Sequence, residues 1–432
     1  MKKVVLILLM VGVLLSPGGC AEPSANGEDA ASGETLRSEK ERITAPEVDE
    51  SDLATLVEGN NSFALDLYRA LRETDRNLFY SPYSISLALG MVHAGARGET
   101  EQQMADTLRF GLPPRRLHPA FNSLDIELAT RGEGAEGKDG EGFRLNIVNA
   151  IWGQEGYGFL AAFLDLLAEN YGAGLRVLDF ASAPEASRVT INNWVSEHTE
   201  GRIEDLIPPG LISEITRTVI TNAIYFNAAW QHQFNERATS DGTFYLLDGG
   251  EVTARMMNRT APFGYAEGDS YQAVELPYDG GELSMLVLLP RPGEFEAFES
   301  SLDAQRVKDI AESLEARRVV LTMPRFGFQS SYRLAEVLGA MGMPIAFSAD
   351  ADFSGMTGKR ELFISEVLHK AFVSVDEAGT EAAASTAVIM PGGIEDDTSS
   401  VVVTLERPFV FVIRDIKTGT ILFVGRLVSP GE

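Results

Sequence analysis

The first half of the chain carries apolar residues at helical spacing. Apolar side chains that recur every three or four positions predict helices, here over residues 62–71, 81–96, 100–108 and 186–201. Pro82 stands in a first turn and Gly201 at an end, as is common at helix termini. Alternating or wholly apolar runs predict strands over residues 216–227, 283–290, 319–326, 408–415 and 420–428. Early helices and later blocks of strands, without strict alternation, predict an α+β protein with antiparallel sheets.

Residues 373–390, VSVDEAGTEAAASTAVIM, combine two patterns. An apolar-alternating strand is followed by a run of Ala, Thr, Ser and Gly, and then by MPGGIEDDTSS, which is typical of an exposed loop. Composition alone is consistent with a linker or surface loop. Laid out as a strand, the run divides into two faces, with Thr380, Ala382 and Ala384 on one and Glu381, Ala383 and Ser385 on the other. The segment therefore has a strand pattern within a loop.

The N-terminus has the features of a secretion signal. Lys2 and Lys3 precede an apolar run over residues 4–15, which is too short to cross about 30 Å of hydrocarbon. We therefore expect a signal peptide over residues 1–19 and an exported protein. The following SPGG and Cys20 resemble the lipobox of bacterial lipoproteins, in which the Cys is lipidated, although Pro17 replaces the usual Leu. The alternatives are an ordinary secreted protein with an incidental Cys and a retained anchor helix.

The residues after Cys20 differ in composition from the rest of the chain. Residues 21–52 are rich in Ala, Glu, Ser, Gly and Asp with almost no large apolar residue, so we expect a flexible acidic tether over residues 20–52. Residues 53–432 contain neither repeats nor a long linker, which predicts one domain. Within it, residues 131–142 are expected to form a solvated loop. Lipid on Cys20 would make this a membrane-anchored lipoprotein, and otherwise the protein is extracellular.

Charge and cysteine content exclude several kinds of partner and cofactor. The chain has 432 residues, of which 44% are hydrophobic, so its apolar mass suffices for a large core. Its 63 acidic and 36 basic side chains give a net charge of −27, which disfavours nucleic acid and anionic lipid as partners. Any membrane contact is expected only through the lipid anchor. With Cys20 as its one Cys, the chain has neither an intramolecular disulfide nor a thiolate metal cluster.

Motifs of catalysis are absent from the sequence. It contains no GxSxG nucleophile elbow, no HExxH zinc motif and no P-loop, and we predict neither an enzyme nor a cofactor. One acidic stretch matches five positions of a calcium loop, namely Asp350, Asp352, Ser354, Gly355 and Glu361. Gly342 and Pro344 interrupt the helix that should precede such a loop, and Thr357 stands where an apolar residue usually packs. An acidic turn without a metal is the preferred interpretation.

Nine segments in order together resemble the serpin family over almost all of residues 53–430. They are NLFYSPYSIS with GARGETEQQM, INNWVSEHTEGRIEDLI, TNAIYFNAAWQHQF, MPRF, DFSGM, ISEVLHKAFVSVDEAGTEAAA, ERPFVFVIRD and FVGRLVSP. The resemblance implies a serpin fold with about three β-sheets, eight to nine helices and an exposed reactive-centre loop at about residues 378–402. Because DFSGM is an ordinary segment of that family, the resemblance also argues against calcium.

The resemblance implies a suicide-substrate inhibitor of serine, or also cysteine, peptidases. In such proteins the peptidase cuts the loop and forms an acyl-enzyme, and the cut loop enters the central sheet as a new strand. Small residues ease this entry, and the corresponding hinge here comprises Glu377, Ala378, Gly379, Thr380, Glu381, Ala382, Ala383, Ala384 and Ser385. The family's sheet-opening region maps to Ser81, Ser84, Asn222, Trp230 and His369. The alternative is a non-inhibitory serpin with a chaperone, carrier or structural role.

The position of the scissile bond depends on where counting begins. Counting from Glu377 by the usual loop length places it at Gly393-Ile394 or Ile394-Glu395. Counting back from the end of the loop instead reaches the acidic pair Asp396 and Asp397, which would suit an aspartate-preferring peptidase. We prefer the first register, because the residues before the cut set the length of the inserted strand. A branched Ile394 favours an elastase-like or subtilisin-like partner, bound by a monomeric inhibitor.

Overall fold

The computed structural model describes residues 34–72, 76–137, 143–380 and 400–431. Its helices are α1 (Glu50–Leu71), α2 (Pro82–His93), α3 (Gly98–Thr107), α4 (Pro114–Ala129), α5 (Ala161–Tyr171), α6 (Pro184–His198), α7 (Phe295–Ser300), α8 (Ala304–Glu312), α9 (Ala335–Met341) and α10 (Ser354–Thr357). Two short 3-10 helices are η2 (Glu236–Ala238) and η3 (Pro344–Phe347). The described part therefore has ten α-helices where the sequence predicted eight to nine.

Sixteen strands are formed by the described residues, and most pairs are antiparallel as predicted. They are β1 (Glu34–Leu36), β2 (Leu78–Tyr80), β3 (Arg144–Gln154), β4 (Leu175–Leu178), β5 (Thr218–Ala229), β6 (Ser240–Tyr245), β7 (Glu251–Gly268), β8 (Tyr271–Pro277), β9 (Leu283–Pro290), β10 (Glu315–Pro324), β11 (Phe326–Arg333), β12 (Glu366–Val375), β13 (Gly379–Thr380), β14 (Val401–Thr404), β15 (Phe409–Asp415) and β16 (Ile421–Leu427).

These strands make two sheets rather than the expected three. The central sheet has seven strands in the order β1-β4-β3-β5-β13-β12-β11. The second sheet follows the order β14-β10-β7-β8-β9-β15-β16-β2, and β6 pairs with β7 beside this path. The long strand β7 explains the difference, because its first part pairs with β6, its last part pairs with β8, and β10 spans both parts. What was expected as two sheets is thereby joined into one.

One predicted strand, residues 319–326, crosses the junction between the sheets. β10 ends at Pro324, which has no N–H to donate to a ladder, and β11 begins at Phe326. β10 belongs to the second sheet and β11 to the central sheet. The chain therefore changes sheets at Arg325, which lies beside the hinge described below.

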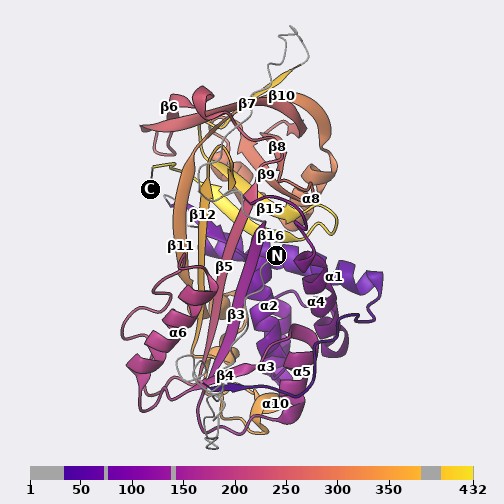
Figure 1. Cartoon of the computed structure of the whole chain (residues 1–432), viewed down its shortest axis with the longest axis vertical. Coiled ribbons are helices and arrows are strands. Elements are labelled where there is room, and N and C mark those ends of the chain that lie inside the picture. The colour runs from indigo at the N-terminus through magenta and orange to yellow at the C-terminus, as the bar shows by residue number, and fades with distance from the viewer. Residues whose placement is uncertain (1–33, 73–75, 138–142, 381–399, 432) are drawn as a thin grey trace, which may run out of the picture.

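The central sheet is covered on both faces along its middle. Every residue of β5 is buried, which explains why its apolar residues lie on both faces of the strand and do not alternate with exposed polar ones. On one face, Ile191 and Val195 of α6 share a core with Trp152 of β3 and Val219 of β5. On the other face, α2 packs within the main core, where all of its residues are buried. Figure 1 shows the strands running along the long axis, with α6 on one side and α1 to α5 on the other.

The segment over residues 34–52, predicted to belong to a flexible tether, packs against the body instead. β1 adds a strand to the edge of the central sheet beside β4, and Leu36 and Val48 contact the main core. α1 begins at Glu50, earlier than the predicted Ser62, because Leu56 and Val57 already face the core. Sparse apolar residues thus suffice to hold this segment. Residues 20–33 of the predicted tether lie outside the described residues.

No helix in the described ranges has the length and apolar character required to cross a membrane.

Candidate functional site

The first hinge residues form a short strand within the central sheet. β13 runs antiparallel to β5, where Gly379 faces Ala229 and Thr380 faces Ala228. On its other side Thr380 faces Val375 of β12. The hinge therefore already separates β5 from β12 at this end of the sheet, which we call the hinge end.

Away from the hinge end, β5 and β12 pair directly. Residues 219–224 of β5 run parallel to residues 366–371 of β12, and we call this contact the seam. Because β13 is antiparallel to β5 and to β12, a strand that continued from it along the seam would be antiparallel to both neighbours. The arrangement thus presents a closed parallel seam next to the start of an antiparallel strand.

Gly379 is positioned by a close approach of two backbones. A Cβ atom at this residue would lie 2.1 Å from the carbonyl oxygen of Ala228 and 2.8 Å from the Cα of Ala229. No side chain fits at such distances unless the strand moves. The Gly in the hinge is therefore required by the pairing of β13 with β5.

Glu377 anchors the base of the hinge through a buried carboxylate. The residue is 2% exposed, its side chain accepts a hydrogen bond from the Thr239 hydroxyl, and it forms an ion pair with Arg325. Its carbonyl oxygen also accepts a hydrogen bond of 2.9 Å from the Phe234 N–H. Burial acts to raise the pKa of Glu377, but the hydrogen bonds from Arg325 and Thr239 outweigh it and hold that pKa below its ordinary value. The hinge is thus attached by an ionised group.

Trp230 and Tyr278 line the hinge from the side. The Trp230 backbone N–H donates to the carbonyl oxygen of Ala378 at 2.9 Å, and its indole Nε1–H donates to that of Asp376 at 2.9 Å. The ring of Trp230 stacks on Tyr278 with centroids 4.7 Å apart. Tyr278 and Thr380 share a hydrogen bond of 2.9 Å between their hydroxyl groups. Every hinge residue from Ala378 to Thr380 is therefore held by a defined partner.

A second polar group lies in the middle of the seam. His369 of β12 faces Asn222 of β5, and Asn222 faces Asn149 of β3, so three polar residues stand side by side across three strands. Asn222 Nδ2 donates to Ser84 Oγ at 2.6 Å and also bonds Asn149 Oδ1, while the Ser81 N–H donates to His369 Nε2 at 3.1 Å. We call these five residues the seam cluster.

The hydrogen bonds of the seam cluster fix the state of its imidazole. Because His369 Nε2 accepts from the Ser81 N–H, the proton resides on Nδ1, which donates to Asn222 Oδ1. Burial lowers the pKa of His369 to about 3, although the hydrogen bond with Asn222 acts in the opposite direction. The seam is consequently closed by a neutral hydrogen-bonded network, without an ion pair among these five side chains.

The structure separates the predicted sheet-opening residues into two places. Ser81, Ser84, Asn222 and His369 meet in the seam cluster, whereas Trp230 contacts the hinge. Asn149 was missed by sequence reasoning. The signal for it was an Asn between the apolar residues Val148 and Ala150, but only the register of β3 against β5 brings it to Asn222.

Comparison with known proteins identifies the family of this chain. The family described as Serpin (serine protease inhibitor) matches residues 58–430. The chain belongs to the serpin family. Leukocyte elastase inhibitor from Bos taurus is 40% identical over 387 residues, which cover 87% of this chain and 99% of that protein. The description of the family names protease inhibitors and not enzymes.

Solved serpin structures share the fold across most of the chain. The thermophilic serpin tengpin in its native state matches with a TM-score of 0.79 and 28% identity, over 91% of this chain and 97% of tengpin. Human thyroxine-binding globulin, solved as a thyroxine complex, matches with a TM-score of 0.79 and 29% identity, over 88% of this chain and 100% of that one. The α+β serpin fold predicted from the sequence is confirmed.

The remaining predicted site residues lie outside the described part of this serpin. They are Cys20, Glu381, Ala382, Ala383, Ala384, Ser385, Gly393, Ile394, Glu395, Asp396 and Asp397. The acidic stretch at residues 350–361 is described, and there Asp352 pairs with Arg360 and accepts a hydrogen bond from the Ser354 N–H. Within the described ranges, no three His, Cys, Asp or Glu side chains are grouped so that they could hold a metal ion.

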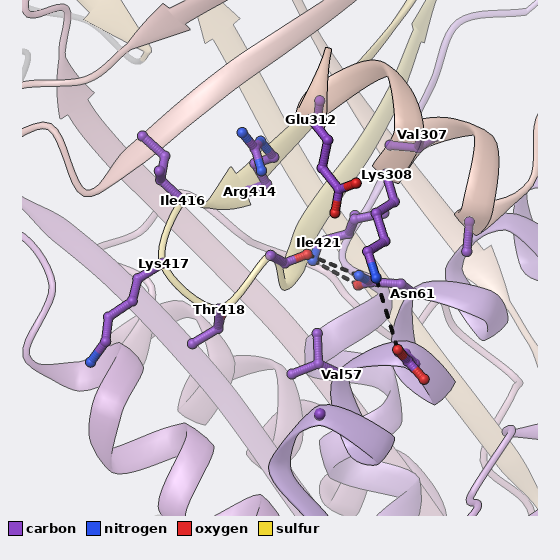
Figure 2. A pocket seen from close by; sticks show the side chains of 15 residues that line it. Val57, Asn61, Val307, Lys308, Glu312, Arg414, Ile416, Lys417, Thr418 and Ile421 are labelled. Atoms are coloured by element: carbon purple, nitrogen blue, oxygen red, sulfur yellow. Dashed lines mark hydrogen bonds and ion pairs between the residues drawn. The ribbon is translucent and has the colours of Figure 1, made fainter. Parts of the chain in front are cut away.

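A pocket of about 430 Å³ lies apart from the hinge and the seam (Figure 2). α1 contributes Val57, Glu58 and Asn61, and α8 contributes Val307, Lys308 and Glu312. Residues of β15, β16 and the turn between them complete the wall. Asn61 ties this turn to α1, since its Nδ2 donates to the Gly419 carbonyl oxygen at 2.9 Å and its Oδ1 accepts from the Ile421 N–H at 2.9 Å. The pocket therefore combines apolar residues and a fixed amide with side chains of both charges.

Proposed function

We propose that this serpin is a suicide-substrate inhibitor of serine peptidases that traps the acyl-enzyme by inserting its cut loop between β5 and β12. The observation that carries the proposal is β13, because the first hinge residues already stand between these two strands. The residues that follow Thr380 in sequence, Glu381 to Ser385, are mostly small. Small side chains favour entry between two packed strands, whereas bulky or charged ones on the inward face oppose it.

The topology of the seam supplies a driving force for insertion. Before insertion, β5 and β12 share one parallel ladder. A strand inserted along the seam would replace that ladder with two antiparallel ladders, which are slightly more stable per residue and satisfy more backbone groups. Insertion thus releases free energy that the uncut protein retains, and this release is available to trap a bound peptidase.

The proposed target is an elastase-like or subtilisin-like peptidase. One relative carries the name leukocyte elastase inhibitor, and in this chain the preferred register places Gly393 and Ile394 at the cut. A branched apolar side chain such as Ile394 contributes about 1.5–3 kcal/mol when it is buried in an apolar pocket. The neighbouring Glu395, Asp396 and Asp397 would favour peptidases with basic rims, mainly through the association rate.

A peptidase panel tests the proposal directly. The intact serpin is incubated with elastase-like, subtilisin-like, trypsin-like and aspartate-preferring peptidases, and the products are read as SDS-stable complexes on a gel. Mass spectrometry of the released C-terminal peptide then identifies the cut. We expect complexes with the first two classes and a cut at Gly393-Ile394 or Ile394-Glu395. Cleavage after Asp397 would move the reactive bond to the alternative register, and cleavage without any complex would contradict inhibition.

Substitution of Ile394 sharpens the specificity claim. Ile394→Arg should shift inhibition toward trypsin-like peptidases, whose primary pocket holds a carboxylate. Ile389→Arg, five residues earlier in the sequence, is the control for charge alone and should leave target choice unchanged. If Ile394→Arg leaves target choice unchanged as well, Ile394 does not enter the primary pocket.

We also propose that the serpin is a monomer exported with a lipid on Cys20. The sequence over residues 1–20 supports this proposal through its basic start, apolar run and terminal Cys. Replacement of Cys20 by Ala should move the protein from the membrane fraction to the medium. Equal fractionation of both forms would support an ordinary secreted protein instead.

A second candidate function is the carriage of a small amphipathic molecule, and the pocket in Figure 2 favours it. Val57 and Val307 offer apolar contacts, and Lys308, which lies 4.0 Å from Glu58, and Glu312 offer polar groups of both charges. Thyroxine-binding globulin shows that the fold is compatible with carrying a small molecule. Binding of the fluorescent probe anilinonaphthalene sulfonate, abolished by Val307→Arg but unaffected by Val189→Arg on α6, would support this candidate. Absence of such binding would remove it.

A further inference from the structure

Residues 34–49 run from the edge of the central sheet onto two helices, and we call them the edge strap. At its start, β1 pairs antiparallel with β4, with Glu34 facing Val177 and Leu36 facing Leu175. The strap passes close to Gly174, where an added Cβ would lie 2.7 Å from the Leu36 carbonyl oxygen. A residue with a Cβ atom at this position would collide with the strap, so Gly174 makes room for it.

The rest of the strap is fixed to α5. The Ser38 hydroxyl donates to Asp165 Oδ1 at 2.5 Å, and the Ile43 N–H donates to the Glu169 carbonyl oxygen at 2.9 Å. An exposed pair of Lys40 with Glu169 at 3.7 Å adds little. Through these bonds the strap continues from the edge of the sheet onto the helical layer.

Arg42 attaches the same strap to α4. Its Nε donates to Asn122 Oδ1 at 2.8 Å, and its Nη2 forms an ion pair with Asp125 Oδ2 at 2.6 Å. Asn122 in turn donates to the Ile43 carbonyl oxygen at 2.7 Å. Both side chains of the ion pair are mostly covered, with 29% and 23% exposure. A planar guanidinium that bonds two helical side chains is a specific attachment and not a chance surface contact.

These contacts bear on how the sheet can widen. Entry of a strand at the seam requires β5 and β12 to move apart by about 4.8 Å more than their present spacing. β5 is joined to β3, β3 to β4, and β4 to β1, so the half of the sheet on the β5 side ends in the strap. A displacement of that size exceeds the range of a hydrogen bond. If this half moves, either the strap detaches from α4 and α5 or the two helices travel with it.

We propose that the edge strap is a built-in restraint on widening of the central sheet, which sets how readily the seam opens before any peptidase cuts the loop. The inference rests on the proposed function for its biological meaning, since only an inhibitor needs a seam that opens on demand. The restraint itself is a property of the uncut molecule and can be measured without a peptidase.

Hydrogen exchange of the intact serpin tests the restraint. Gly174→Ala displaces the strap without changing any strap residue, because the new Cβ would overlap the Leu36 carbonyl. Gly158→Ala is the matched control, since nothing lies within 4 Å of a Cβ there. We expect amides of residues 219–224 and 366–371 to exchange roughly ten-fold faster or more in Gly174→Ala and at the parental rate in Gly158→Ala. Equal exchange in both variants would overturn the proposal.

A second pair of variants covers the case in which Gly174→Ala fails to fold. Arg42→Ala removes the attachment to α4, and Lys40→Ala removes only the exposed pair. Arg42→Ala should speed exchange along the seam, whereas Lys40→Ala should not. If the seam responds in this way but no peptidase complex forms, the proposed function fails and the restraint stands. If complexes form but Arg42→Ala leaves amide exchange along the seam unchanged, only the proposed restraint is contradicted.

Discussion

The hinge end and the middle of the seam hold the same two strands in opposite ways. At the hinge end, β5 and β12 are already separated by β13, and the chain is anchored by an ionised Glu377 paired with Arg325. In the middle, the two strands pair directly and are closed by a neutral network around His369 and Asn222. We therefore expect insertion to start at the anchored hinge end and to require that the neutral network in the middle of the seam breaks as the strand advances.

The contrast follows from the local environment of each group. Arg325 is 41% exposed on its side chain, so its charge is partly hydrated and it supports a buried carboxylate without full desolvation. His369 is completely buried and has no counter-ion among the seam cluster, so only its neutral form is compatible with the fold. A neutral network offers hydrogen bonds that can be exchanged for those of an incoming strand, whereas an ion pair is better suited to hold one position.

The largest expected effect comes from a charge placed in β13. Thr380 is already buried in β13 of the uncut protein, where it is 2% exposed and bonds Tyr278. Thr380→Arg cannot keep this place without burying an unpaired cation, so we expect β13 to leave the sheet and the hinge to enter it more slowly after the cut. We expect the protein to change from inhibitor to substrate, with the number of serpin molecules consumed per peptidase rising roughly ten-fold or more. Thr260→Arg, at an exposed position of β7, is the control and should leave this number unchanged. An unchanged number in Thr380→Arg would contradict insertion of the hinge.

Removal of the hinge anchor should have the next largest effect. Glu377→Leu leaves the Thr239 hydroxyl and Arg325 without their partner, and we expect the free energy of unfolding to fall by about 2 kcal/mol in urea titrations. Asp241→Leu breaks a pair with Arg255 whose side chains are 67% and 54% exposed, and it should change stability by about 0.5 kcal/mol or less. Equal effects of the two substitutions would show that the anchor is no stronger than a surface pair.

The seam cluster should respond more moderately. Asn149→Leu removes an acceptor used by Asn222 and a donor to the Ser84 carbonyl oxygen, so about 1–2 kcal/mol of stability should be lost. Asn146→Leu on the same strand is the control, and thermal unfolding of both variants provides the measurement. A larger loss at Asn146 would mean that the cluster does not hold the seam.

The effect that is smallest at neutral pH is a change in pH dependence. The pKa of His369 is lowered from 6.5 to about 3 by burial, so the unfolded chain binds its proton first as the pH falls. The stabilisation is therefore complete above about pH 6.5 and is lost progressively below it. His93 and His118 are lowered likewise, to about 4 and about 3, and they contribute to the same slope.

Urea titrations between about pH 4.5 and 6 isolate the contribution of the His369 imidazole to the pH dependence of stability. His369→Gln should reduce the slope of stability against pH by about 1.4 kcal/mol per pH unit, which is the value for one proton. His198→Gln removes an exposed imidazole and serves as the control. If the slope is the same in His369→Gln and in the parent, the imidazole is not held neutral in the seam.

The sequence predicted those features that depend on local pattern. The strand over residues 283–290 was placed with its exact bounds, and those over 408–415 and 420–428 within one residue at each end. Resemblance to a family named four of the five residues that the structure brings together in the seam cluster. These predictions needed only neighbouring residues or known motifs.

Features that depend on distant contacts were missed. The union of two expected sheets follows from the length of β7 and its pairing with β10, which no local pattern reveals. Asn149 became part of the seam cluster only through the register of β3 against β5. Residues 34–49 look like a tether in composition, and their order depends on Gly174 and Asn122 far along the chain. Short polar segments are thus the ones for which composition alone predicts least.

Thermal unfolding of the intact and the loop-cleaved serpin is the most direct test of the central claim. Cleavage with a non-target peptidase frees the hinge to continue from β13 along the seam, so the cut protein should gain two antiparallel ladders and melt at a much higher temperature than the intact protein. Cut Thr380→Arg should gain little. If the cut and intact forms of the unmodified chain melt at the same temperature, the loop does not enter the sheet and the account of this molecule as an inhibitor is wrong.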